Sequence, residues 1–88
     1  IGLIGDAYME KGEIDKAVSN YSKAVGKAGE NKFVAPYLML KLAVAYEKQQ
    51  KLQDALGVYE KIKANFPSSA EGREALKMIP TLSQKLGK

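Results

Sequence analysis

The feature that most constrains the fold of this chain is an internal repeat: the sequence resembles itself when shifted by 38 residues. Identical residues meet at this offset, among them the pairs Ala7 and Ala45, Tyr8 and Tyr46, Ala17 and Ala55, and Tyr21 and Tyr59. Self-similarity at a period of this size is typical of stacked helical hairpins, each of which buries its apolar face against its neighbour.

Each repeated unit reads as two helices joined by a short turn. Apolar residues recur every three or four positions, which predicts helices over residues 1–11, 14–28, 36–49 and 52–65. Gly12 and Gly29 stand at two predicted helix ends, where a left-handed residue is favoured. Pro36 suits a first turn, and Phe66-Pro67 ends the fourth helix.

A fifth helix follows the repeats. Ser68 and Glu71 form a capping-box pattern at its start. Pro80 should kink or split the helix, because its ring clashes with the preceding turn; we expect ordered stretches over 69–78 and 81–86. The predicted fold is therefore one all-α domain over residues 1–88, with repeat 1 at about 1–29, repeat 2 at about 36–67 and a C-terminal helix at about 69–86.

The composition argues against catalysis and against cofactors. The chain has no cysteine and no histidine, which removes thiolate and imidazole ligands, cysteine nucleophiles and the commonest general base. Asp6 and Glu10 lie one helical turn apart, but such a pair without a pocket or a third ligand is more often a solvated helix face. We therefore expect a non-enzymatic protein with no metal and no cofactor.

The distribution of charged and apolar residues argues against nucleic acid as a partner and against membrane insertion. Thirteen lysines and one arginine outnumber ten carboxylates, for a net charge of +4, but acids are interspersed with them throughout. Nucleic-acid binding would gather the positive charge on one stripe, so we expect none. No apolar run approaches the roughly 20 residues that span a bilayer, so no membrane insertion by this segment is expected.

The repeated residues resemble the tetratricopeptide motif, W-x2-L-G-x2-Y followed by A-x3-F and P. The matching stretches are Ile1-x2-Ile4-Gly5-x2-Tyr8 with Ala17-x3-Tyr21, and Met39-x2-Leu42-Ala43-x2-Tyr46 with Ala55-x3-Tyr59 and Pro67. The resemblance implies a right-handed array of two helix-turn-helix hairpins. The period is about four residues longer than the family's, which predicts a longer connection over 29–35. Residues 59–70 also resemble bacterial cell-envelope members of this family.

Small residues of the motif predict close helix packing within each hairpin. We expect Gly5 or Ala43 on the first helix to meet Ala17 or Ala55 on the second. Tyrosines would then fill the space on either side of that contact.

The resemblance also implies a function, the binding of another protein. In the family, the first helix of each hairpin lines a groove that holds a peptide or helix of a partner. The corresponding face here carries Asp6, Met9, Glu10, Tyr37, Leu40, Lys41, Val44, Glu47 and Lys48. Neither first helix contains an asparagine, and Asp6 and Glu10 would repel a carboxylate, which argues against recognition of an acidic C-terminal peptide.

Tyr37, Leu40 and Val44 form an apolar stripe that needs cover. A partner segment in the groove is one interpretation of this stripe. The C-terminal helix or a neighbouring repeat could cover it instead, and so could a second copy of the chain in a homodimer. The sequence leaves these alternatives open.

Overall fold

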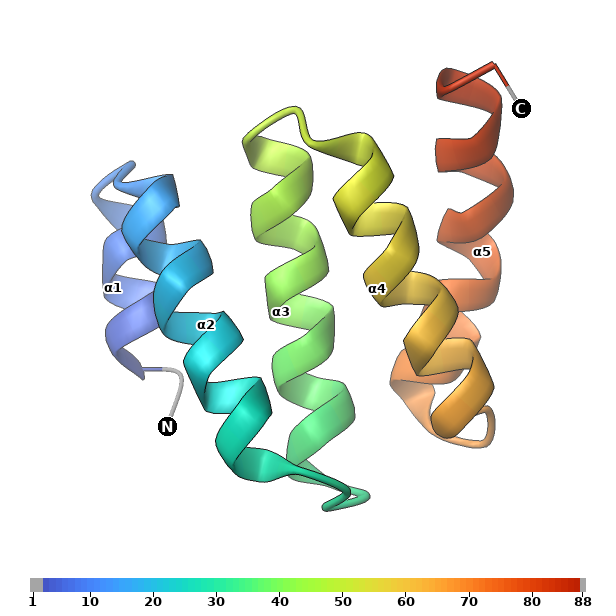
Figure 1. Ribbon diagram of the computed structural model, residues 1–88, viewed down its shortest axis with the longest axis horizontal. Coiled ribbons are helices and arrows are strands. Elements are labelled where there is room, and N and C mark those ends of the chain that lie inside the picture. Colours follow the sequence, from blue (N-terminus) through green and yellow to red (C-terminus); the bar gives the residue numbers. More distant parts are fainter. Residues whose placement is uncertain (1–2, 88) are drawn as a thin grey trace.

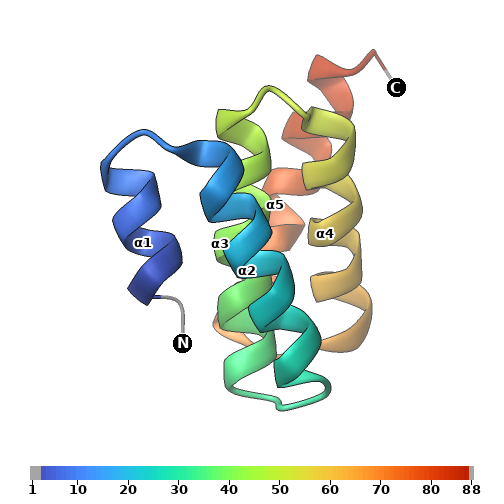
Figure 2. The ribbon, with the colours of Figure 1, turned by 60° about the vertical axis from the view of Figure 1, so that its left-hand side comes forward.

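The computed structural model describes residues 3–87 and contains five helices (Figure 1). They are α1 (Leu3–Glu10), α2 (Ile14–Ala28), α3 (Val34–Lys48), α4 (Leu52–Asn65) and α5 (Ala70–Lys85). Each helix packs against the next along the chain, and Figures 1 and 2 show them as a row of antiparallel neighbours. This confirms the predicted all-α, tetratricopeptide-like array. The predicted helix start at residue 1 lies outside the described residues.

The two hairpins turn in the same way. The N–H of Glu13 donates to the carbonyl of Tyr8, and the N–H of Lys51 donates to the carbonyl of Tyr46, both at 2.9 Å. These bonds close a Schellman motif, which requires a left-handed residue just after the helix. Gly12 supplies it in the first hairpin, with φ of 79°. Gln50 occupies the equivalent position with φ of 65°, a left-handed conformation that the sequence pattern does not predict for a glutamine.

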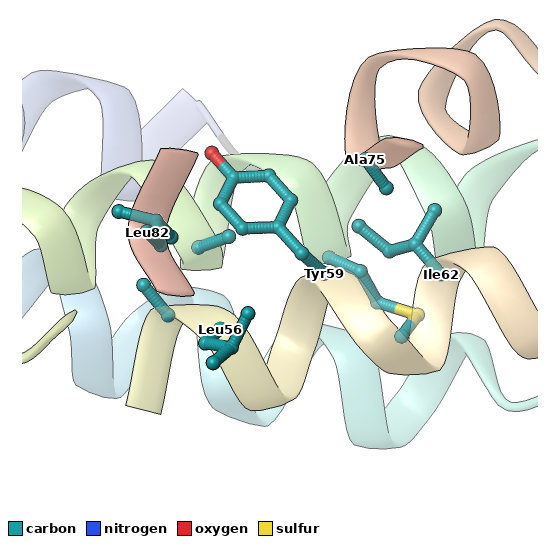
Figure 3. Close-up of a cluster of buried hydrophobic side chains, with 8 residues drawn as sticks. Leu56, Tyr59, Ile62, Ala75 and Leu82 are labelled. Carbon is teal, nitrogen blue, oxygen red and sulfur yellow. The ribbon is translucent and has the colours of Figure 1, made fainter. Parts of the chain in front are cut away.

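Two clusters of buried side chains form the core. The smaller lies where α2 meets α3 and consists of Ala17, Tyr21, Leu42 and Ala45. The larger joins α3, α4 and α5 and consists of Met39, Ala43, Ala55, Leu56, Tyr59, Ile62, Ala75 and Leu82 (Figure 3). A tyrosine at the same position of each repeat is thus the largest side chain of its cluster.

The close approach within the first hairpin involves Gly5 and the ring of Tyr21, while the expected meeting of Gly5 with Ala17 stays a prediction. Gly5 is buried, and the three heavy atoms nearest to the position that a Cβ would take belong to the Tyr21 ring. A Cβ at position 5 would lie 2.5 Å from the ring carbon Cε1 of Tyr21. The glycine therefore makes room for the ring of the second helix.

The connection between the hairpins spans residues 29–33, two residues shorter than the predicted 29–35. α3 begins at Val34, two residues before the expected start at Pro36. Asn31 explains the earlier start, because its Oδ1 accepts hydrogen bonds from the N–H groups of Phe33 (3.0 Å) and Val34 (2.9 Å). These bonds satisfy donors that the first turn of a helix leaves without partners.

Two predictions for α5 are wrong. Ser69, not Ser68, is the N-cap: its Oγ accepts from the N–H of Gly72 at 2.9 Å. Gly72 has to approach the preceding turn closely, since a Cβ there would lie 2.2 Å from the carbonyl oxygen of Phe66. Pro80 does not split the helix, which runs unbroken from Ala70 to Lys85. Pro80 is exposed, so water can solvate the carbonyl that its missing N–H leaves without a helical partner.

Candidate binding groove

A shallow hollow of about 490 Å³ lies between α1 and α3. It brings together six of the nine predicted groove residues and adds Tyr21 from α2. The six are Asp6, Met9, Glu10, Leu40, Lys41 and Val44. They come together because α3 packs beside the first hairpin and turns one face toward α1.

Asp6 is the centre of a polar network in this hollow. Its carboxylate accepts a hydrogen bond from the hydroxyl of Tyr21 and pairs with Nζ of Lys41 at 3.1 Å. The Tyr21 bond and the Lys41 charge lower the pKa of Asp6, against the opposing effect of burial. The network joins α1, α2 and α3, and it holds Lys41 in place.

The pKa values of Tyr21 and Lys41 are raised, whereas that of Asp6 is lowered. Burial raises the pKa of the Tyr21 hydroxyl, and the bond to Asp6 raises it further, so the hydroxyl remains a donor. Burial lowers the pKa of Lys41, but its hydrogen bonds to Asp6 and Tyr37 outweigh this effect and the net shift is upward. Lys41 is therefore a fixed cation rather than a titrating group.

The predicted apolar stripe remains partly open. Tyr37 is 47% exposed and Val44 is 37% exposed, whereas Leu40 packs in part against the core cluster of α3, α4 and α5. Nζ of Lys41 lies 5.0 Å from the centroid of the Tyr37 ring, within range of a cation–π contact. The C-terminal helix thus leaves two of the three stripe residues accessible.

Tyr37 does not line this hollow, and neither do Glu47 and Lys48. The carboxylate of Glu47 accepts a hydrogen bond of 2.6 Å from the hydroxyl of Tyr59 and is directed toward α4. Burial, followed by this bond, raises the pKa of Tyr59. Lys48 is exposed at the end of α3. Helical spacing put both residues on the groove face, but it could not reveal that a buried tyrosine of α4 would need Glu47 as its acceptor.

A second and larger hollow, which the sequence reasoning missed, lies at the end of the array where α2 joins α3 and α4 joins α5. Its volume is about 1020 Å³, and its lining includes Phe33, Met39 and Phe66. Phe33 is 87% exposed. The predicted long connection was the available signal for this site, because four residues of the observed connection over 29–33 line the hollow.

Two other kinds of feature are absent from the part of the chain that the structure describes. Within residues 3–87, no group of three or more carboxylates, histidines or cysteines could hold a metal ion. In the same part of the chain, no helix combines the length and apolar character needed to cross a membrane.

Residues 37–69 match the family model of the tetratricopeptide repeat. The match covers Tyr37 to Ser69, which is the second hairpin with most of α3 and all of α4. It supports membership of a tetratricopeptide-repeat family, whose members generally mediate protein–protein interactions and are typically non-catalytic. No curated protein and no solved structure matches the chain.

Proposed function

We propose that this chain is a non-catalytic protein–protein interaction module that binds a peptide or helix of a partner in the groove between α1 and α3. The observation that carries the proposal is the exposure of Val44, which lines the hollow, and of Tyr37, whose ring contacts the lining residue Lys41, although α5 is in place. Adjacent exposed apolar side chains next to a concavity are typical of recognition sites.

The chemistry of the groove indicates what a partner would offer. Apolar side chains of the partner would cover Tyr37 and Val44. Lys41 is already neutralised by Asp6, so it adds little attraction for an anion. Glu10 is exposed at the rim and favours a partner cation over a carboxylate. The groove therefore suits an amphipathic segment that places a lysine or arginine near the end of α1.

A homodimer through the same stripe is the alternative, because a second copy would also cover Tyr37 and Val44. It differs in a measurable way: association would depend on the concentration of this chain alone. Nucleic acid is not proposed as a partner, since the lysines are scattered and interspersed with acids along the chain.

The experiment is affinity capture with the purified chain, followed by calorimetry with the captured partner. Val44→Lys and Tyr37→Ser alter exposed positions, so both variants should fold, which circular dichroism would verify. Leu76→Ser is the matched control, since Leu76 is 51% exposed on α5 and lines neither hollow. We expect both groove variants to lose the partner and the control to keep it; equal binding by all four proteins would refute the groove.

We also propose a bacterial cell-envelope location, on the resemblance of residues 59–70 to envelope members of the family. Fractionation of the source cells with an antibody against the chain tests this part separately. Recovery in the cytosolic fraction would contradict it without affecting the groove.

A further inference from the structure

The hollow next to Phe33 is distinct from the proposed groove. Its lining residues belong to the α2–α3 and α4–α5 connections and the helices next to them, and these two connections lie at the bottom of Figure 1. Met39 and Phe66 contribute apolar surface to it, and its volume of about 1020 Å³ leaves room for an aromatic ring. None of its lining residues takes part in the smaller hollow between α1 and α3.

Phe33 is held in place beside this hollow and does not fill it. Among the described residues it is the most exposed large apolar side chain, at 87%. Its backbone is fixed, because its N–H donates to Oδ1 of Asn31 at 3.0 Å and the next N–H donates to the same atom. A ring on a pre-ordered backbone loses little conformational entropy when it is buried, which favours a contact role.

The rim of the hollow carries both signs of charge. Lys32 stands beside Phe33, while Glu30 and Glu71 border the same cavity. A rim of one sign would repel an identical surface. A rim with a cation and carboxylates can instead pair with a copy of itself, because Lys32 of each copy can then meet a carboxylate of the other.

From these observations we propose that a second copy of this chain docks here about a two-fold axis, so that Phe33 of each copy enters the hollow of the other. An isologous interface requires one self-complementary patch, and this patch holds a projecting ring, a cavity of matching chemistry and a mixed-charge rim. The inference does not rest on the proposed function, because it uses the opposite end of the helices and leaves the α1–α3 groove free.

Sedimentation velocity over a wide concentration range tests the proposal. We expect the wild-type chain to show a concentration-dependent monomer–dimer equilibrium. Phe33→Ser should raise the dissociation constant at least about tenfold, since each copy loses one buried ring. Ile4→Ser is the control: Ile4 is also exposed, at 61%, but lies on α1 away from this hollow, so its dimer should be unchanged.

A charge exchange checks the geometry. Lys32→Glu makes the rim wholly acidic and should weaken the dimer at low salt, and adding Glu71→Lys in the same chain should restore it. A wild-type chain that stays monomeric at every concentration would overturn the proposal. So would a dimer that survives Phe33→Ser, or one that dissociates only with Val44→Lys, since that result would place self-association in the groove.

Discussion

The two hairpins share one sequence pattern but differ in what surrounds them. Ile4 and Ala7 of α1 are exposed, whereas their counterparts 38 residues later, Leu42 and Ala45, are buried. The reason is position: α2 packs against this side of α3, while no described helix precedes α1. A repeat motif therefore specifies which residues face a neighbour, and only the array determines whether the neighbour exists.

The buried tyrosines extend this comparison. Tyr21 donates to Asp6 and Tyr59 donates to Glu47, so each hydroxyl finds a carboxylate on the first helix of its own hairpin. The two acceptors are not equivalent, because the counterpart of Asp6 is Val44 and that of Glu47 is Met9. Burial of a hydroxyl demands a partner, but any carboxylate within reach satisfies the demand. The two repeats thus share the buried tyrosine, but the carboxylate that accepts its hydrogen bond stands at a different position in each.

The largest predicted effect comes from the pair of positions that differ in burial. Leu42→Ala should cost about 2–5 kcal/mol of unfolding free energy, because it leaves a cavity next to Tyr21. Ile4→Ala should change stability by less than about 0.5 kcal/mol, since that side chain is already in water. Urea denaturation measures both, and equal costs would show that the outer face of α1 is covered in solution.

The next effect concerns the helix glycines. Gly5→Ala should destabilise the fold by about 1–3 kcal/mol, because the added methyl would press on the Tyr21 ring, which is 2% exposed and bonded to Asp6. Gly57→Ala is the matched control: a Cβ there meets nothing within 4 Å, so helix propensity should stabilise α4 by roughly 0.5–1 kcal/mol. Thermal melting of the two variants should shift in opposite directions, and a stabilised Gly5→Ala would contradict this packing.

Substitutions at the two left-handed turn positions should have smaller effects on stability, of opposite sign. Gln50→Gly should stabilise the chain by up to about 1 kcal/mol, because glycine adopts the positive φ without steric cost. Gly12→Ala should destabilise it by about 1 kcal/mol for the converse reason. Both changes lie at exposed positions, so chemical denaturation would report the backbone term. A destabilised Gln50→Gly would mean that the glutamine side chain contributes more than its backbone strain costs.

The smallest effect is electrostatic. Asp6→Asn should cost at most about 1 kcal/mol at neutral pH, because the pair with Lys41 is partly exposed. The pKa of Asp6 is lowered in the folded state, so its stabilising contribution is complete above the unfolded pKa and is lost as the pH falls through the folded value. The gap between wild type and variant should therefore begin to narrow below about pH 4 and continue to narrow as the pH falls through the lowered folded pKa. A gap that stays constant from neutral pH down through the acid range would show that Asp6 acts through packing instead of charge, with the exposed Glu10→Gln as the control.

Much of the fold could be read from apolar spacing. The predicted bounds of the second and fourth helices coincide with α2 and α4. Six of the nine residues that the spacing predicted for the groove line one hollow. The start of α3 was missed because the capping side chain of Asn31 acts two or three residues ahead, outside the apolar pattern. The predicted break at Pro80 was wrong because an exposed carbonyl does not need its helical bond.

The sequence by itself determined the periodic features: the helices, the glycine turn at Gly12 and the ring that each hairpin buries. These depend on neighbours three to five residues apart, so local spacing is sufficient. Only the tertiary structure decided that Glu47 serves Tyr59, that Lys41 is neutralised by Asp6, and that Phe33 stands beside an open hollow. Each of these depends on which side chains a neighbouring helix or connection brings within reach. The 38-residue repeat does not specify which side chains of two different helices come into contact.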